Sequence, residues 1–278
     1  MIRRPADPQT GCIELRGARL RYDMAGDGPP LLMLMGLGVP GRGWSPQIPA
    51  LSAHFRTLTV DQRGTGESCD WGRPLTIFDL ARDAVELLDR LGIARAHLLG
   101  MSMGGMVSLE IAGRWPERVD RLVICCAPVR ADRRIRRSTL ALSSRSVAAF
   151  LRAGGGAAGL VAARERLKAD WIPAVFSDRL DEGQAREVRT LMAALDDPRA
   201  GRGLVAQSCA VLRHDARRWA ARIRAETLVV GGTLDRMISM EAVCRTAQAI
   251  RGSRLVFLEG APHGLNHCPR GGVQRTPH

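Results

Sequence analysis

Apolar residues recur along this chain in short runs, and one long amphipathic segment lies among them. Residues 13–16 and 18–22 alternate apolar and polar positions, as half-exposed antiparallel strands do. Residues 31–35 are apolar at every position, which is typical of a strand buried on both faces. Residues 76–91 place apolar side chains at helical spacing, and Gly92 follows, where glycine ends many helices. The first third of the chain therefore predicts strands joined by helices.

Further apolar runs predict strands, and most of them lead into a turn or loop signal. They are residues 55–60, 97–99, 121–127, 227–230 and 254–258. Strands that alternate with helices predict the α/β class, a mostly parallel sheet with right-handed crossovers and helices on both faces. We assign residues 1–128 and 225–264 to this core.

The alternation of strands and helices stops between residues 129 and 224. The loop of glycines 154–156 and breaks near Pro173, Pro198 and Gly201–Gly203 divide this region into several helical patterns, and no strand-like run interrupts them. We predict an all-helical insertion over residues 129–224, between two strands of the sheet. Insertions at this place commonly act as lids.

The net charge of +13, from 41 basic and 28 acidic residues, could indicate a nucleic acid or an anionic membrane as partner. The arginines are dispersed and interleaved with acids, however, and only residues 133–137 form a dense cluster. No nucleic-acid module pattern accompanies that cluster, and no apolar run approaches the roughly 18 residues that span a bilayer. We predict neither nucleic acid nor membrane as a partner.

The chain contains seven cysteines, an odd number with no Cys-x-x-Cys pair, so neither a disulfide framework nor a zinc site is expected. They are Cys12, Cys69, Cys125, Cys126, Cys209, Cys244 and Cys268. Residues 1–8 include arginines but no apolar stretch behind them, so we do not expect a secretion signal. We predict a reduced, cytoplasmic protein with no cofactor and no metal, and we leave a homodimer open.

The strongest chemical signal lies in residues 98–107, where an apolar strand leads into Gly-x-Ser-x-Gly and then into a helix. Gly100 and Gly104 remove side chains that would clash in the sharp turn, so the hydroxyl of Ser102 is lifted clear of the sheet. The start of the following helix offers unpaired N–H groups to a developing negative charge. The pattern predicts that Ser102 is a nucleophile.

A serine nucleophile needs a base, and the base needs a group that orients it. Asp235 stands in the loop after residues 227–230, and His263 stands in the loop after residues 254–258. Both loops leave the C-terminal edge of the predicted parallel sheet, where such sheets place their sites. We predict that His263 takes the proton of Ser102 and that Asp235 holds the imidazole.

Other residues compete for these two roles. His267 lies too far beyond its strand, and the remaining histidines sit within or beside helix and strand patterns, where a structural role is more common. These histidines are His54, His97 and His214. Asp61 ends a strand, but the turn-rich residues 62–68 follow it, so we expect it to hold that loop.

Two N–H donors should hold the carbonyl oxygen of a substrate when it becomes an oxyanion. We predict the amide of Met103, directly after the nucleophile, and the amide of Leu37, in the loop of residues 35–38. Backbone amides perform this role, so apolar side chains are compatible with it.

The chain resembles the α/β-hydrolase superfamily through five motifs that span nearly everything except the helical insertion. They are Met35–Gly38 with Trp44, Asp61–Ser68, Gly100–Gly105, Gly232–Asp235 and Gly260–Gly264. The chain looks most like the lidded branch of serine esterases, enol-lactonases, carbon–carbon bond hydrolases and haloperoxidase-like esterases. The serine at position 102 disfavours the dehalogenases and epoxide hydrolases of this fold, which carry aspartate there.

The sequence departs from the family pattern at two places. Met35-Gly36 stands where most relatives carry His-Gly before the oxyanion loop. Relatives also end in a helix packed on the sheet, whereas residues 265–278 contain two prolines, paired glycines and no apolar stripe. We therefore predict an irregular tail, a missing C-terminal helix, a sheet face that is under-covered, and a shortened or altered relative.

The resemblance and the three candidate residues predict hydrolysis of a small-molecule ester or lactone through an acyl-enzyme. Cleavage of a carbon–carbon bond by the same residues is one alternative, and a non-catalytic ligand-binding relative is another. The arginine-rich insertion could favour substrates that carry a carboxylate, because positive potential over a cleft attracts anions.

Overall fold

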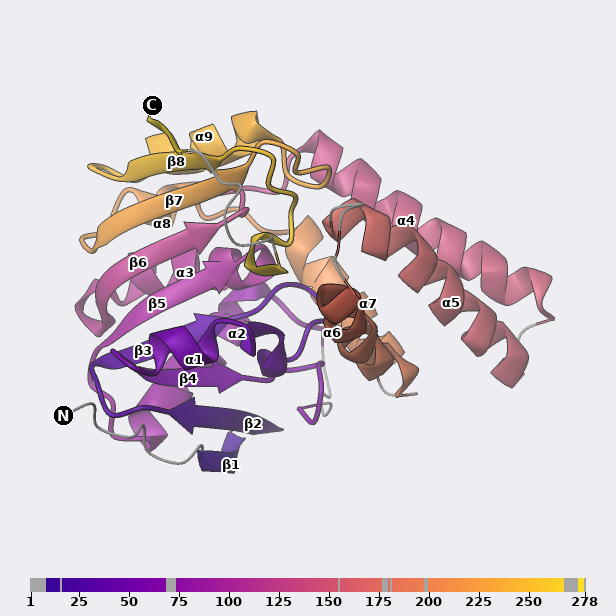
Figure 1. The fold of residues 1–278 in the computed structure, drawn as a ribbon, viewed down its shortest axis with the longest axis horizontal. Helices are drawn as coiled ribbons and strands as arrows, with labels where there is room; N and C mark the ends of the chain where they lie inside the picture. The colour runs from indigo at the N-terminus through magenta and orange to yellow at the C-terminus, as the bar shows by residue number, and fades with distance from the viewer. Residues whose placement is uncertain are drawn as a thin grey trace.

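The computed structural model describes residues 9–15, 17–68, 74–154, 156–176, 180, 182–197, 200–267 and 275–277. Strands in these residues form one nine-stranded sheet in the order β1-β2-β4-β3-β5-β6-β7-β8-β9. The strands from β4 to β8 in this order pair in parallel, and β1, β2 and β9 pair antiparallel at the two sides. The predicted α/β class and its mostly parallel sheet are confirmed (Figure 1).

The strands other than β9 lie close to the predicted apolar runs. They are β1 (Gln9–Leu15), β2 (Ala18–Ala25), β3 (Pro30–Leu34), β4 (Arg56–Val60), β5 (Ala96–Met101), β6 (Val119–Cys125), β7 (Glu226–Gly232), β8 (Arg254–Leu258) and β9 (Arg275–Pro277). The helices of the core are α1 (Ile48–Leu51), α2 (Ile77–Arg90), α3 (Met103–Arg114), α8 (Arg217–Ala220) and α9 (Met240–Ala249). Short 3₁₀ turns are η1 (Gly41–Trp44), η2 (Pro116–Arg118), η3 (Ala193–Asp196) and η4 (Leu265–His267).

Local sequence explains the bounds of α2. Thr76 accepts a hydrogen bond from the amide of Asp79, and the Asp79 side chain accepts one from the amide of Thr76. This reciprocal pair satisfies two donors at the helix start. Gly92 follows the helix with φ 67°, a left-handed backbone conformation that glycine adopts without strain. The predicted helix over residues 76–91 is confirmed.

The two faces of the sheet are not equally covered. On one face Leu98, Leu122 and Val229 are fully buried in a core shared with α2, α3 and α9. On the other face Met33, Met101 and Cys125 are also buried, but Leu99, Val123, Leu228 and Val256 are only half-buried. The described elements packed there are α1, η1, η4 and part of the helical insertion. Residues 31–35 are buried at every position, as the sequence predicts for a strand covered on both faces.

Helices α4 (Arg133–Arg152), α5 (Gly156–Val175), α6 (Glu182–Met192) and α7 (Ala200–Leu212) lie between β6 and β7. They form the helical insertion, which falls within the residues 129–224 assigned from the sequence. Figure 1 shows the insertion beside the edge of the sheet at which the parallel strands end, with α4 and α5 side by side and projecting outward. No helix among the described residues has the length and apolarity needed to cross a membrane.

The tail differs from the irregular segment that the sequence predicts. Residues 265–267 form η4, and β9 pairs antiparallel with β8, so a strand extends the sheet after the histidine loop. The tail residues 268–274 and 278 lie outside the described part of the chain. Residues 1–8, for which we expect no secretion signal, also lie outside it. The described cysteines are free thiols, and Cys69 and Cys268 lie outside this description.

The side chain of His214, which follows α7, predicts an acid sensitivity of the fold. His214 is 3% exposed, and burial lowers its pKa from 6.5 to about 4, although the charge of Asp215 partly opposes the shift. The unfolded chain therefore takes up a proton near pH 6.5 and the folded chain does so only near pH 4. The contribution of the neutral His214 to the free energy of unfolding is complete above pH 6.5. It is lost as the pH drops toward 4, by up to roughly 3 kcal/mol.

Urea unfolding at pH 7 and at pH 4.5 measures this loss. We expect the variant His214→Leu to lose less stability between the two pH values than the wild type does. The exposed His54→Gln variant, as a control, should behave like the wild type. Equal losses in the wild type and in His214→Leu would contradict the assignment to His214.

Candidate active site

Ser102 lies on the sharp turn between β5 and α3. Its backbone has φ 52° and ψ −117°, a strained conformation for a residue with a side chain. A Cβ atom at Gly104 would lie 2.0 Å from the carbonyl oxygen of Leu34, and one at Gly100 would lie 2.4 Å from that of Gly104. The two glycines are therefore sterically required. The Ser102 amide donates to the carbonyl of Cys125 at 2.8 Å, which ties the turn to β6.

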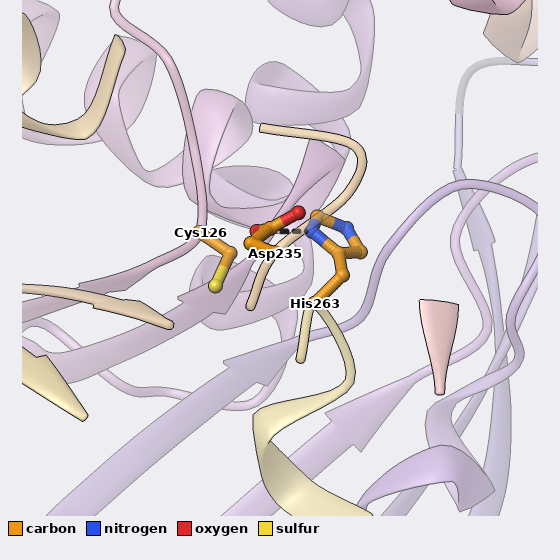
Figure 2. Close-up of side chains that lie close together, drawn as sticks. All are labelled: Cys126, Asp235 and His263. Atoms are coloured by element: carbon orange, nitrogen blue, oxygen red, sulfur yellow. Dashed lines mark hydrogen bonds and ion pairs between the residues drawn. The ribbon is translucent and has the colours of Figure 1, made fainter. Parts of the chain in front are cut away.

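Asp235 and His263 form a buried pair at the ends of β7 and β8. The Nδ1 atom of His263 lies 2.8 Å from Oδ2 of Asp235, and the two side chains are 6% and 1% exposed. The other carboxylate oxygen of Asp235 accepts the amides of Met237 and Ile238, each at 2.8 Å. The structure thus brings together two of the three predicted residues, from loops 28 residues apart (Figure 2).

The charge of Asp235 is favoured by its partners. Burial raises the pKa of this carboxyl, but the His263 imidazole and the two amides outweigh burial and leave the pKa below its ordinary value. Asp235 is therefore ionised at neutral pH. An ionised carboxylate beside Nδ1 favours the tautomer in which Nδ1 carries the proton and Nε2 is free to accept one.

Ser102 and His263 line the same pocket. The described residues contain no hydrogen bond between the Ser102 hydroxyl and the His263 ring, so the structure places the two groups in one cavity without joining them. Such contacts are often long in enzymes without substrate and tighten when substrate binds.

The two predicted oxyanion donors also line this pocket. Among the described residues, neither the amide of Leu37 nor that of Met103 donates a hydrogen bond; Met103 is the first residue of α3, where helix amides have no partner within the helix. A Cβ atom at Gly36 would lie 3.9 Å from the Ser102 hydroxyl oxygen, so the loop before Leu37 passes close to the serine.

Asp61, the competing carboxylate, is buried and hydrogen-bonded to two loops. Its oxygens accept the amides of Gly41 at 2.8 Å and of Glu67 at 2.9 Å. Burial raises the pKa of Asp61, and these two bonds partly oppose that effect. The contacts fit the loop-holding role predicted from the sequence.

Cys126 is a neighbour of the pair that the sequence analysis missed as a site residue. Its Sγ atom and ligand atoms of Asp235 and His263 all lie within 4.8 Å of one another, a set that could in principle hold a metal ion. Figure 2 shows the Asp235 carboxylate joined to His263 by the dashed line, with Cys126 beside it. The backbone of Cys126 is unusual for a residue with a side chain, because its φ is 48°.

A metal would need the Cys126 thiolate. Burial, and after it the charge of Asp235, raise the pKa of this thiol well above its ordinary value. The thiol is therefore neutral, and the cluster offers a metal only a carboxylate and an imidazole that already bind each other. The sequence-based expectation of no metal stays a prediction.

The pocket is lined mainly by apolar side chains from the core and from all four helices of the insertion. From the insertion come Ile135 and Thr139 of α4, Trp171 and Val175 of α5, Leu191 of α6 and Val211 of α7, together with Phe176 just after α5. No arginine or lysine is among the described lining residues, so the basic charge of the insertion does not face the pocket. This arrangement removes the basis for the expected preference for carboxylate-bearing substrates.

The fold, the strained serine turn and the buried Asp–His pair define an α/β hydrolase. The family model described as the alpha/beta hydrolase fold matches residues 29–159. A relative from Stutzerimonas stutzeri is 30% identical over 253 residues, covering 88% of this chain and 89% of that protein. The chain therefore belongs to the α/β-hydrolase superfamily, and the predicted membership is confirmed.

The relatives carry the names of several hydrolases. The Stutzerimonas stutzeri relative is named for a carbamate hydrolase, RutD, as is a protein of Azorhizobium caulinodans that is 39% identical over 120 residues. The Azorhizobium match spans 43% of this chain and only 45% of that protein. The solved enol-lactonase from Burkholderia xenovorans LB400 is 28% identical, with a TM-score of 0.78, over 92% of this chain and 94% of that one.

Proposed function

We propose that this hydrolase cleaves a carboxylic ester or lactone of a small apolar molecule through an acyl-enzyme at Ser102. The observation that carries the proposal is the buried pair of Asp235 and His263, whose imidazole lines one pocket with the strained Ser102. The name of the Burkholderia enol-lactonase, a structural relative over nearly the whole chain, supports the same class of bond.

The proposed reaction has two steps, acylation of Ser102 and hydrolysis of the acyl-enzyme, and His263 transfers protons in both. His263 Nε2 takes the hydroxyl proton while the Ser102 oxygen attacks the substrate carbonyl, and Asp235 stabilises the imidazolium. The amides of Leu37 and Met103 donate to the oxyanion. The tetrahedral intermediate collapses, the alkoxide leaves with the proton from His263, and an acyl ester remains on Ser102. Water, deprotonated by His263, then attacks this ester. The second tetrahedral intermediate breaks its bond to Ser102, the acid is released, and His263 returns its proton to the serine oxygen.

The lining of the pocket argues for an apolar acyl group. Trp171, Phe176 and Leu191 face the pocket from the insertion, and Met35 and Met106 face it from the core. Burying such surfaces against a hydrocarbon substrate is favourable, whereas a small polar substrate would leave them uncovered. The carbamate named for the RutD relatives is a polar group, so the pocket fits an ester of an apolar acid better than a bare carbamate.

The two alternatives from the sequence are less compatible with this pocket. A dienoic substrate of a carbon–carbon bond hydrolase carries a carboxylate, and no described lining residue is cationic. A purely ligand-binding protein has no need of a strained serine backbone, which costs stability, or of a buried Asp–His pair beside it.

We expect kcat/KM for p-nitrophenyl esters to rise from acetate through butyrate to hexanoate, by about two- to fourfold per methylene. The reason is that each buried CH₂ contributes about 0.8 kcal/mol. Initial rates measured on this series, with a p-nitrophenyl carbamate in parallel, provide the test. The variant Trp171→Ala should reduce the dependence on chain length, because the indole lines the pocket.

Two results of this experiment would count against an apolar ester as the substrate. A flat acyl series combined with faster turnover of the carbamate would transfer the assignment to carbamate hydrolysis. Absence of turnover, together with no labelling of the protein by a fluorophosphonate, would favour the ligand-binding alternative.

A further inference from the structure

A glutamine of the insertion lies between the two loops that flank the candidate site. Gln207 is on α7 and is 0% exposed. The residues that flank it, 203–206 and 208–211, are apolar or small, and Arg202 is the charged residue of this helix. The Oε1 of Gln207 accepts the amide of Gly38 at 2.8 Å, and its Nε2 donates to the carbonyl of Arg63 at 2.9 Å. Both ends of this buried amide are therefore satisfied by backbone that is more than 140 residues away in sequence.

The partner of Gln207 is the peptide next to Leu37. Gly38 has φ 72°, and its amide is held in one direction by the Gln207 oxygen. Fixing the plane of the Leu37–Gly38 peptide restricts the backbone of Leu37, whose own amide points to no partner in the described residues. A hydrogen-bond donor that awaits an oxyanion is effective only if it is held in place before the reaction.

Two further side chains hold the same loop, but from the core. Gln62 donates to the carbonyl of Met35 at 2.7 Å, and Asp61 accepts the amide of Gly41 at 2.8 Å. They fix the two ends of the loop of residues 35–41. Among the described side-chain hydrogen bonds, that of Gln207 reaches the middle of the loop.

The backbone of α7 also contacts the core loop directly at this point. A Cβ atom at Gly203 would lie 1.8 Å from the carbonyl oxygen of Gly64, so the two main chains touch and no side chain fits between them. Gly203 lies one helical turn before Gln207, and this contact sets the distance at which the glutamine can reach both loops.

We propose that Gln207 is a positioning residue that couples the helical insertion to the oxyanion loop, and that α7 thereby holds the Leu37 amide in its reactive place. The catalytic consequence of this contact rests on the proposed function. The clamp itself, the pair of hydrogen bonds from Gln207 to Gly38 and Arg63, is a feature of the structure. Residues of α4, α5 and α6 also line the pocket.

The variant Gln207→Met keeps the length of the side chain and removes both hydrogen bonds. We expect kcat for p-nitrophenyl butyrate to fall by about 10- to 100-fold with KM changed less than about threefold, because a displaced donor weakens the transition state more than substrate binding. The control Val205→Ala changes a residue of the same helix that is 64% exposed, and it should leave both constants unchanged.

The variant Gln207→Glu adds a readout that a general loss of packing would not move. A protonated glutamic acid offers one donor and one acceptor, as the amide does, whereas its ionised form offers only acceptors. The activity of this variant relative to the wild type should therefore rise as the pH is lowered from 8 to 5.5. This variant also keeps the proposal testable if Gln207→Met does not fold.

Hydrogen–deuterium exchange separates the clamp from the proposed function. Peptides covering residues 35–41 should exchange faster in Gln207→Met than in the wild type, whether or not the protein hydrolyses esters. Unchanged exchange in this segment overturns the clamp. Faster exchange with unchanged kcat retains the contact but overturns its role in positioning the donor. A wild type without turnover or serine labelling counts against the proposed function instead.

Discussion

Replacing Ser102 with alanine is expected to lower kcat for p-nitrophenyl butyrate by at least about 10⁴-fold and to abolish labelling by a fluorophosphonate. The reason is that Ser102 supplies the oxygen that forms the acyl bond, and no other described serine or threonine lies on a strained turn in the pocket. Alanine fits the site because a Cβ atom is already present at this position. The fold should therefore be kept, which a melting curve would show.

The exposed Ser45→Ala variant is the matched control, since Ser45 follows η1 and does not line the pocket. It should retain wild-type rates and full labelling. Labelling of Ser102→Ala at the wild-type level would show that the probe reacts elsewhere and would end the assignment of Ser102 as nucleophile.

Replacing Asp235 with asparagine should lower kcat by about 10³- to 10⁴-fold while the protein stays folded. Asparagine can still accept the amides of Met237 and Ile238 through its oxygen, so the loop after β7 keeps its hydrogen bonds. Its NH₂ group would then face Nδ1 of His263, which must accept rather than donate. The imidazole proton moves to Nε2, and the ring can no longer take a proton from Ser102.

The same substitution has a predicted effect on stability in acid. The pKa of Asp235 is below its ordinary value, so its ionised form stabilises the fold at pH values above the ordinary carboxyl range. This contribution is lost as the pH falls through the lowered pKa of the folded state. Asp235→Asn should remove that part of the pH dependence, as measured by urea unfolding between pH 7 and pH 3.

Asp120→Asn is a suitable control, because Asp120 pairs with Arg95 at the surface, away from the pocket residues. It should keep the rate of the wild type. If Asp235→Asn also kept that rate, another carboxylate would have to orient His263, and the arrangement of the pair in this structure would carry no catalytic meaning.

Short sequence windows determined most of the fold. Each strand run and the helix at residues 76–91 could be predicted because burial leaves a period of two or of 3.6 in the residues themselves. Gly100 could be interpreted as a steric requirement, since a Cβ atom there would meet the carbonyl of Gly104 in the same tight turn. The clash at Gly104 is instead with Leu34 of the neighbouring strand β3. The order of Ser102, Asp235 and His263 after successive strands predicted which residues could meet at one edge of a parallel sheet.

Only the tertiary structure decided how the helical insertion meets that edge. The pocket combines side chains of α4 to α7 with core loops, and amphipathic patterns do not record which helix face meets which loop. The under-covered sheet face, the strand β9 and the neutral thiol beside Asp235 depend in the same way on distant partners.

Gln207 is the clearest example of a residue whose contacts could not be predicted from the sequence. A single amide in the apolar helix α7 was the one sequence signal available, and its two partners lie 144 and 169 residues away. By itself the sequence determined the class of the protein, its strand order along the chain and the three residues of a candidate relay. The tertiary structure decided the chemistry of the pocket wall and the support of the oxyanion loop, because both arise from contacts between segments that carry no local record of each other.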